Sequence, residues 1–191
     1  MGFVAYRPQA GVEPPLIVVD LGFSSNDATC GLKAPEQDAR NRSFGPMTKD
    51  VRKLLSEHPT AVLVLEAPLS AKYKKNGNPI RRGDFEGGHH GQDPKYWYYN
   101  AGAQMALAAQ RLLSALQDEP QLRERDIRLA EAFLTRAVLP DADHKHVAEE
   151  IYAHFHEVAP HWVDGGVPLH PAVPEAPGVW VFTAAVLGNA G

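Results

Sequence analysis

The sequence contains a single cysteine, Cys30, so no disulfide can form within the chain. It has no apolar run near the roughly 20 residues that a membrane-spanning helix needs. Residues 1–15 lack the apolar stretch of a signal peptide, and Tyr6 stands where a myristoylation signal requires Ser or Thr. These absences exclude a disulfide-stapled or membrane-inserted protein, and we expect a cytoplasmic one.

The chain also has no excess of positive charge. Its 19 Lys and Arg residues are outnumbered by 23 Asp and Glu residues, which gives a formal net charge of −4. Dedicated nucleic-acid binders are usually basic, so the balance counts mildly against such a role for the molecule as a whole. With 191 residues, 44% of them hydrophobic, the chain is long enough for one domain with a substantial core.

Strand and helix signals alternate along the chain. Residues 16–20 and 61–66 are apolar runs rich in β-branched residues, and each ends in an acid. Apolar residues at helical spacing, preceded by polar N-caps or followed by prolines, indicate helices elsewhere. Strands are predicted over residues 16–20, 28–33, 42–44, 61–66, 127–134 and 179–182. Helices are predicted from the N-cap Thr48 to Pro59, over residues 101–116, and from Asp141 or Asp143 to about residue 158.

This order predicts an α/β fold with a mixed five-stranded sheet, in which a three-strand meander is followed by two parallel strands flanked by helices. It is the order of the ribonuclease-H-like topology. Residues 1–15 are predicted to be a leader and residues 16–158 the domain. Residues 159–191 are predicted to be a Pro/Gly-rich tail whose terminal strand packs on the same domain. Residues 67–95 are predicted to be a long loop, which in a compact domain is usually functional or mobile.

Two acids end neighbouring strands of the predicted sheet, Asp20 and Glu66. Ligands of open α/β sheets bind beyond the carboxyl ends of the parallel strands, so these carboxylates are expected to converge. Two like charges at close range repel, and a hard divalent cation relieves the repulsion because carboxylate oxygens are its preferred ligands. The sequence therefore predicts a site for Mg²⁺ or Mn²⁺, with Asp20 and Glu66 as catalytic metal ligands.

A further ligand is expected from the last predicted helix, whose first turn contains Asp141, Asp143, His144 and His146. Asp143 and His146 lie three residues apart and project from one helical face. Asp143 and Asp141 are candidate metal ligands, and Asp143 and His146 are candidate catalytic residues. Either aspartate is equally compatible with a simple N-cap. Such a constellation could hold two metal ions roughly 4 Å apart and align a water for in-line attack on a phosphodiester, which is a two-metal mechanism. Glu131 either points into this site or pairs with an arginine.

These residues resemble a family of predicted ribonuclease-H-like nucleases of unknown function. The resemblance rests on the sequences at residues 18–22 (VVDLG), 65–70 (LEAPLS) and 82–84 (RGD), and on the AEAF segment at residues 130–133. Asp143 and His146 occupy the places of an Asp-x-x-Asp pair on the closing helix, and the match spans roughly residues 16–158. The scheme is distantly similar to Holliday-junction resolvases. The resemblance implies a metal-dependent nuclease acting on DNA or RNA.

A basic stretch follows Glu66 and is predicted to contact the phosphates of a nucleic acid. It comprises Lys72, Lys74, Lys75, Arg81 and Arg82. Two other interpretations remain open: a nucleotide phosphate binder related to actin-like ATPases and sugar kinases, and a non-catalytic binding module that keeps the fold. The Asp-x-Gly pattern at Asp20 favours the first, and His146 in place of an acid favours the second. The oligomeric state is also open, with a homodimer among the alternatives.

Overall fold

The computed structural model describes residues 4–5, 13–25, 27–82, 101–132, 143–156, 161–163, 166–170 and 180–183. The helices in these residues are α1 (Phe44–Glu57), α2 (Ala101–Gln117) and α3 (His144–His154), with a 3₁₀ turn at Pro120–Leu122. The strands are β1 (Val4–Ala5), β2 (Leu16–Asp20), β3 (Cys30–Lys33), β4 (Arg40–Arg42), β5 (Thr60–Glu66), β6 (Ser70–Tyr73), β7 (Pro79–Ile80), β8 (Asp126–Ala132), β9 (His161–Val163), β10 (Val167–Pro168) and β11 (Trp180–Thr183).

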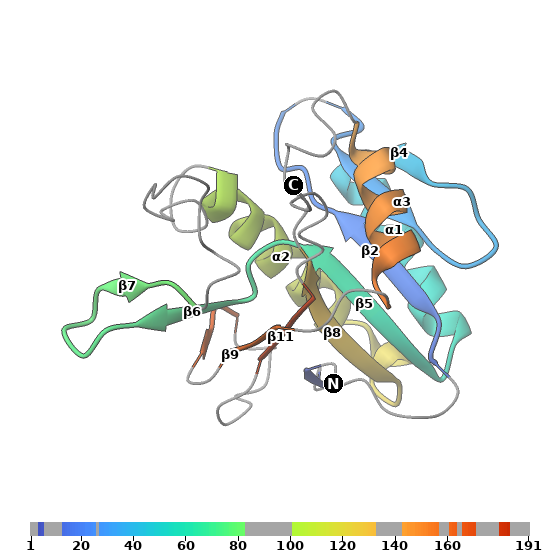
Figure 1. Ribbon diagram of the computed structural model, residues 1–191. Helices are drawn as coiled ribbons and strands as arrows, with labels where there is room; N and C mark the ends of the chain where they lie inside the picture. Colours follow the sequence, from blue (N-terminus) through green and yellow to red (C-terminus); the bar gives the residue numbers. More distant parts are fainter. Residues whose placement is uncertain are drawn as a thin grey trace.

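The molecule is α/β, with a mixed sheet at its centre (Figure 1). Five strands follow the order β4-β3-β2-β5-β8, in which β3 is antiparallel to both its neighbours and β2, β5 and β8 are mutually parallel. This arrangement confirms the predicted meander followed by two parallel strands. Beyond β8 the sheet continues through β11 and then β9. Strand β1 pairs in parallel with β8.

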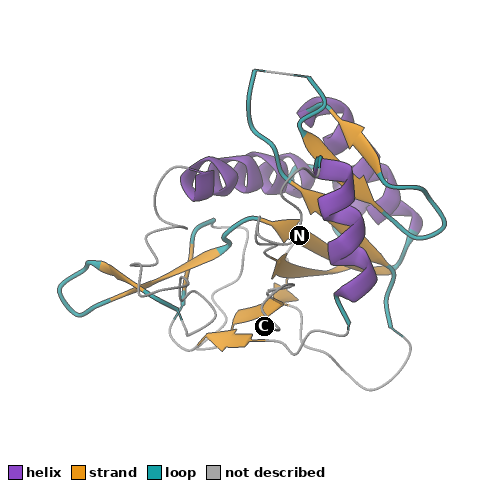
Figure 2. Ribbon diagram, turned by 45° about the horizontal axis from the view of Figure 1, so that its top comes forward, coloured by secondary structure: helices purple, strands orange, loops and turns teal. Residues whose placement is uncertain are grey.

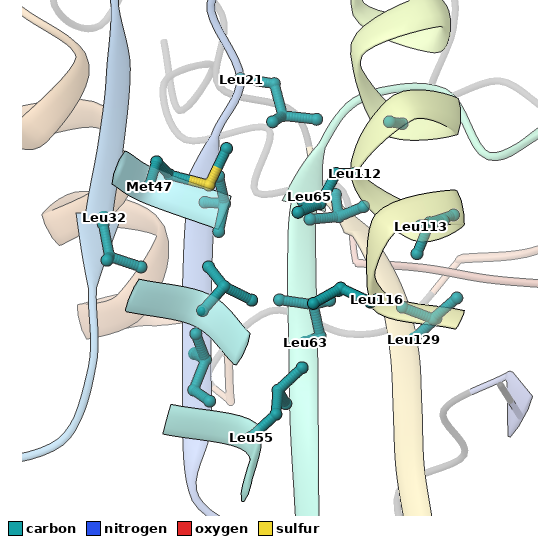
Figure 3. Close-up of a cluster of buried hydrophobic side chains, with 14 of the residues drawn as sticks. Leu21, Leu32, Met47, Leu55, Leu63, Leu65, Leu112, Leu113, Leu116 and Leu129 are labelled. Atoms are coloured by element: carbon teal, nitrogen blue, oxygen red, sulfur yellow. The ribbon is translucent and has the colours of Figure 1, made fainter. Parts of the chain in front are cut away.

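Helices cover both faces of the sheet, which explains why its central strands are continuously apolar (Figures 1 and 2). Ile17 and Val19 of β2 face a core shared with α1 and α2, whereas Leu16 and Val18 face a second core shared with α3. Figure 3 shows the first of these cores. Its labelled members are Leu21, Leu32, Met47, Leu55, Leu63, Leu65, Leu112, Leu113, Leu116 and Leu129.

Two predicted boundaries near α1 are wrong. The helix has Ser43 as its N-cap, so Thr48 lies inside it, where its hydroxyl donates to the carbonyl of Phe44. Gly45 and Pro46 have the composition of a helix break, but proline is tolerated in the first turn because the N–H groups there have no partner within the helix. The preceding strand consequently ends earlier than predicted, at Arg42.

The segment predicted as a long loop contains a β-hairpin. Strands β6 and β7 pair antiparallel, and the turn between them places Gly77 at a φ of +82°, a conformation that glycine adopts without strain. Residues 83–95 lie outside the described part of the chain. The predicted leader and tail also supply strands: β1 joins β8, and β10 joins β6 in a separate three-stranded sheet. No helix in the described ranges is long and apolar enough to cross a membrane.

Candidate active site

Asp20 and Glu66 stand side by side at the carboxyl edge of the sheet. They end the parallel strands β2 and β5 and are direct partners in the register of that strand pair. The strands are neighbours as predicted, so two acids 46 positions apart in the chain converge. Only 3% of Asp20 is exposed, whereas Glu66 is half-buried. The pair therefore has one member shielded by the protein and one closer to solvent.

Burial raises the pKa of Asp20 from 3.8 to about 6, because a carboxylate loses its hydration inside the protein. A hydrogen bond between its side chain and that of Glu66 acts in the opposite direction. A hydrogen bond between two carboxyl groups requires a proton on one of them. This edge of the sheet therefore either retains a proton or needs a cation to neutralise the pair.

His144 is the third titratable group at this edge. It is the first residue of α3, and its Nδ1 lies 2.8 Å from Oδ2 of Asp20. Burial lowers the pKa of His144, although the charges of Glu66 and Asp143 oppose that shift. A neutral imidazole can accept a proton, and a carboxylate bonded to one ring nitrogen orients the other. With 41% of its side chain exposed, His144 remains accessible to solvent.

The N-terminus of α3 is held against the sheet by two residues of the meander. A Cβ atom at Gly31 would lie 1.8 Å from the carbonyl oxygen of His144, so only glycine allows the helix to approach β3 this closely. Asn41 of β4 donates from Nδ2 to Oδ2 of Asp143 at 3.0 Å. Its Oδ1 accepts from the backbone N–H of Lys145 at 2.8 Å. Asn41 therefore holds both residues that flank His144 in the sequence, Asp143 and Lys145.

Asp143 is the N-cap of α3. Its Oδ1 accepts from the backbone N–H of His146 at 3.2 Å and lies 2.8 Å from Nδ1 of the same residue. Burial acts to raise the pKa of Asp143, but hydrogen bonds from Asn41 and His146 outweigh it and the pKa is lowered. The contacts of Asp143 are therefore those of an N-cap, which was one of the two roles that the sequence allowed. The metal-ligand role of Asp143 and the catalytic role of His146 stay predictions, and Asp141 lies outside the described residues.

Glu131 forms a buried ion pair with Arg82, which answers one question that the sequence left open. Nη2 of Arg82 lies 2.8 Å from Oε1 of Glu131, and the two side chains are 0% and 1% exposed. Nη1 of Arg82 donates to Oε2 of Glu131 at 3.0 Å and to the carbonyl of Ser70 at 2.9 Å. The predicted contact of Arg82 with phosphate is therefore corrected to a structural role, since its guanidinium is enclosed by the protein.

His144 is the site residue that sequence reasoning did not select. It was one of four candidates in the first turn of the helix, and the helical spacing of Asp143 and His146 favoured those two instead. The choice depended on which residue is the N-cap. With Asp143 as the cap, the next residue is the one that contacts Asp20. The glycine at position 31, in a strand that must accommodate a helix, is the signal that could have pointed there.

The donor chemistry of this edge suits a hard divalent cation. Asp20 and Glu66 supply carboxylate oxygens, which Mg²⁺ and Mn²⁺ prefer, and an imidazole nitrogen is also acceptable to Mn²⁺. Within the described ranges, no three His, Cys, Asp or Glu side chains already surround a common point. Comparisons with models of protein families, with curated proteins and with solved structures found no match to this chain.

Proposed function

We propose that this protein is a divalent-metal-dependent nuclease with a ribonuclease-H-like fold, which hydrolyses phosphodiester bonds of DNA or RNA. The observation that carries the proposal is the pairing of Asp20 with Glu66 at the ends of two parallel strands, with Asp20 almost fully buried. Placing a buried carboxyl group beside a half-buried one is costly for stability, and the arrangement is useful where a cation binds. The strand order β4-β3-β2-β5-β8 supports the proposed fold.

In this proposal Asp20 and Glu66 would hold Mg²⁺ or Mn²⁺. The bound cation would stabilise negative charge on the phosphate and lower the pKa of an attacking water. His144 would accept a proton from an attacking water, because burial lowers the pKa of its imidazole and Asp20 orients the ring. Gly31 and Asn41 are positioning residues, since they seat the first turn of α3 against the sheet.

The decisive experiment incubates the protein with single-stranded and structured DNA and RNA in the presence of Mn²⁺. We expect cleavage that falls about 100-fold or more in Asp20→Asn and Glu66→Gln, which remove charge and preserve shape. His144→Gln should lose roughly 10²–10⁴-fold, the usual range for a general base. Binding of Mn²⁺, followed by calorimetry, should weaken in both carboxylate variants.

Matched controls are Asp126→Asn and Glu57→Gln. Both make the same chemical change at exposed or half-exposed carboxylates, and Asp126 begins β8 at the opposite end of the sheet from Asp20. These variants should cleave like the unmodified protein. Cleavage that persists unchanged in Asp20→Asn and Glu66→Gln would show that these acids are not the catalytic pair. Nucleotide binding without cleavage would instead support the actin- and kinase-like alternative.

A further inference from the structure

The β6–β7 hairpin projects from the molecule, away from the central sheet (Figures 1 and 2). We call residues 70–81 the arm. It begins only four positions after Glu66, because β6 follows the carboxyl end of β5 after a short turn. Its two strands pair antiparallel, with Lys72 opposite Ile80 and Tyr73 opposite Pro79. The base of the arm therefore lies close to the edge of the sheet that contains Asp20 and Glu66, and its tip points away from the central sheet (Figure 1).

The arm is strongly basic in a protein whose formal net charge is −4. It contains Lys72, Lys74, Lys75 and Arg81 and no Asp or Glu. Lys74, Lys75 and Arg81 are exposed, and Lys72 is half-buried. None of these four cations has an ion-pair partner among the residues that the structure describes. A local concentration of uncompensated positive charge attracts a polyanion.

Buried contacts mount the arm rigidly on the central sheet. Arg82, directly after the arm, pairs with Glu131 of β8 and donates to the carbonyl of Ser70 at the arm's other end. Glu131 also accepts from the backbone N–H of Leu69 at 2.9 Å. One carboxylate and one guanidinium thus fasten both ends of the arm to β8. Because β8 neighbours β5, the arm has a defined position relative to Glu66.

The distribution of charge on the arm fits a groove lined by two phosphate backbones. Cross-strand partners share a face, so Lys72 and Ile80 lie on one face and Tyr73 and Pro79 on the other. Alternation along the chain puts Arg81 on the Tyr73 face, and Lys74 and Lys75 belong to the turn at the tip. Beyond Ala71, where β10 no longer pairs with β6, the arm is two-stranded, and a two-stranded ribbon fits the major groove of a duplex. Single-strand binding relies on successive stacking aromatics, and the arm has only Tyr73.

We propose that the arm binds the sugar–phosphate backbones of a nucleic-acid duplex and presents that duplex to the edge containing Asp20 and Glu66. The inference deepens the nuclease proposal and rests on it for the identity of the polyanion. The lysines and Arg81 contact phosphates, and the Arg82–Glu131 pair positions the arm without touching the duplex. Recognition of this kind depends on salt and is independent of base sequence.

The test measures binding of a fluorescently labelled 20-base-pair DNA duplex by anisotropy in EDTA, where no cleavage occurs. The full chain is compared with Lys72→Gln/Lys74→Gln/Lys75→Gln. We expect the triple variant to bind at least about 10-fold more weakly, and the slope of log affinity against log salt to become shallower by about 2–3. The matched control Lys49→Gln/Lys53→Gln/Arg123→Gln removes the same charge from exposed positions outside the arm and should bind normally.

Equal weakening in both triple variants would overturn the proposal, because net charge alone would then explain the binding. Tighter binding of a single strand of the same length, or binding confined to vesicles containing anionic lipid, would overturn the assignment of a duplex. Thermal unfolding of both variants checks that the fold is intact. The outcome is separate from that of the nuclease test. If the duplex binds through the arm but is not cleaved, only the nuclease proposal is wrong. If cleavage depends on Asp20 but binding does not depend on the arm, only the proposal for the arm is wrong.

Discussion

Asp20 combines deep burial with a neighbouring carboxyl group, and this combination has a measurable consequence for stability. The folded protein retains the Asp20 proton up to about pH 6, whereas the reference carboxyl group releases it near pH 3.8. Between these values the unfolded state binds fewer protons, so the stability contributed by this residue falls as the pH rises. Above about pH 6 both states are ionised and the loss is complete.

Replacing Asp20 by Asn should remove this pH dependence. In EDTA at pH 7 we expect Asp20→Asn to be more stable than the unmodified protein by roughly 1–3 kcal/mol, since each pKa unit corresponds to about 1.4 kcal/mol. Urea unfolding between pH 4 and pH 8 gives the measurement. His144 has a lowered pKa and contributes the opposite slope. Parallel curves of stability against pH for the two proteins would contradict the raised pKa of Asp20.

At the scale of elements, the seating of α3 on the meander decides whether His144 reaches Asp20. The helix touches β3 at Gly31, where a methyl group would collide with the backbone of the first helical turn. Backbone atoms yield less readily than the end of a flexible side chain. Small changes at this contact are therefore expected to move the whole N-terminus of α3.

Gly31→Ala should destabilise the protein by about 1–3 kcal/mol, the usual effect of overpacking, and should lower any Mn²⁺-dependent cleavage. The matched control is Gly45→Ala in the first turn of α1, where an added Cβ would meet nothing within 4 Å. That variant should keep its activity and unfold at the same or a slightly higher temperature, because alanine favours helix over glycine. Equal effects from the two substitutions would argue against the close contact with α3.

At the scale of the whole molecule, the Arg82–Glu131 pair joins the small sheet of β10, β6 and β7 to the central one. Removing one partner leaves the other charge buried and uncompensated. Arg82→Met or Glu131→Gln should therefore cost about 3–5 kcal/mol in free energy of unfolding. The double substitution Arg82→Met/Glu131→Met should recover much of that loss, because it leaves no buried charge.

Thermal and urea unfolding would measure these effects, with Lys53→Gln as the control. Lys53 pairs with Glu57 on the surface of α1, where the side chains are 78% and 47% exposed, so its removal should change stability by less than about 0.5 kcal/mol. A single substitution at Arg82 that is as mild as the control would show that the buried pair contributes little to the fold.

Sequence patterns predicted the central elements well, since their signals are local. Continuous apolar runs marked β2 and β5, and helical periodicity marked α2 to within one residue. The short strands β1, β9 and β10 were not predicted, because two or three residues are too few to show an alternating hydrophobic pattern. Hairpin β6–β7 was missed although its Asn76-Gly77 pair is a turn signal, because lysines replace the apolar alternation that normally flanks such a turn.

The linear sequence determined that Asp20 and Glu66 end buried strands, and topology rules then made those strands neighbours. Only the tertiary structure decided that His144, rather than His146, contacts Asp20, that Asp143 caps a helix, and that Arg82 is buried against Glu131. The physical reason is that strand ends follow from local hydrophobicity. The choice among adjacent polar side chains depends on how one helix turn is rotated and seated, which is settled by contacts such as those of Gly31 with α3.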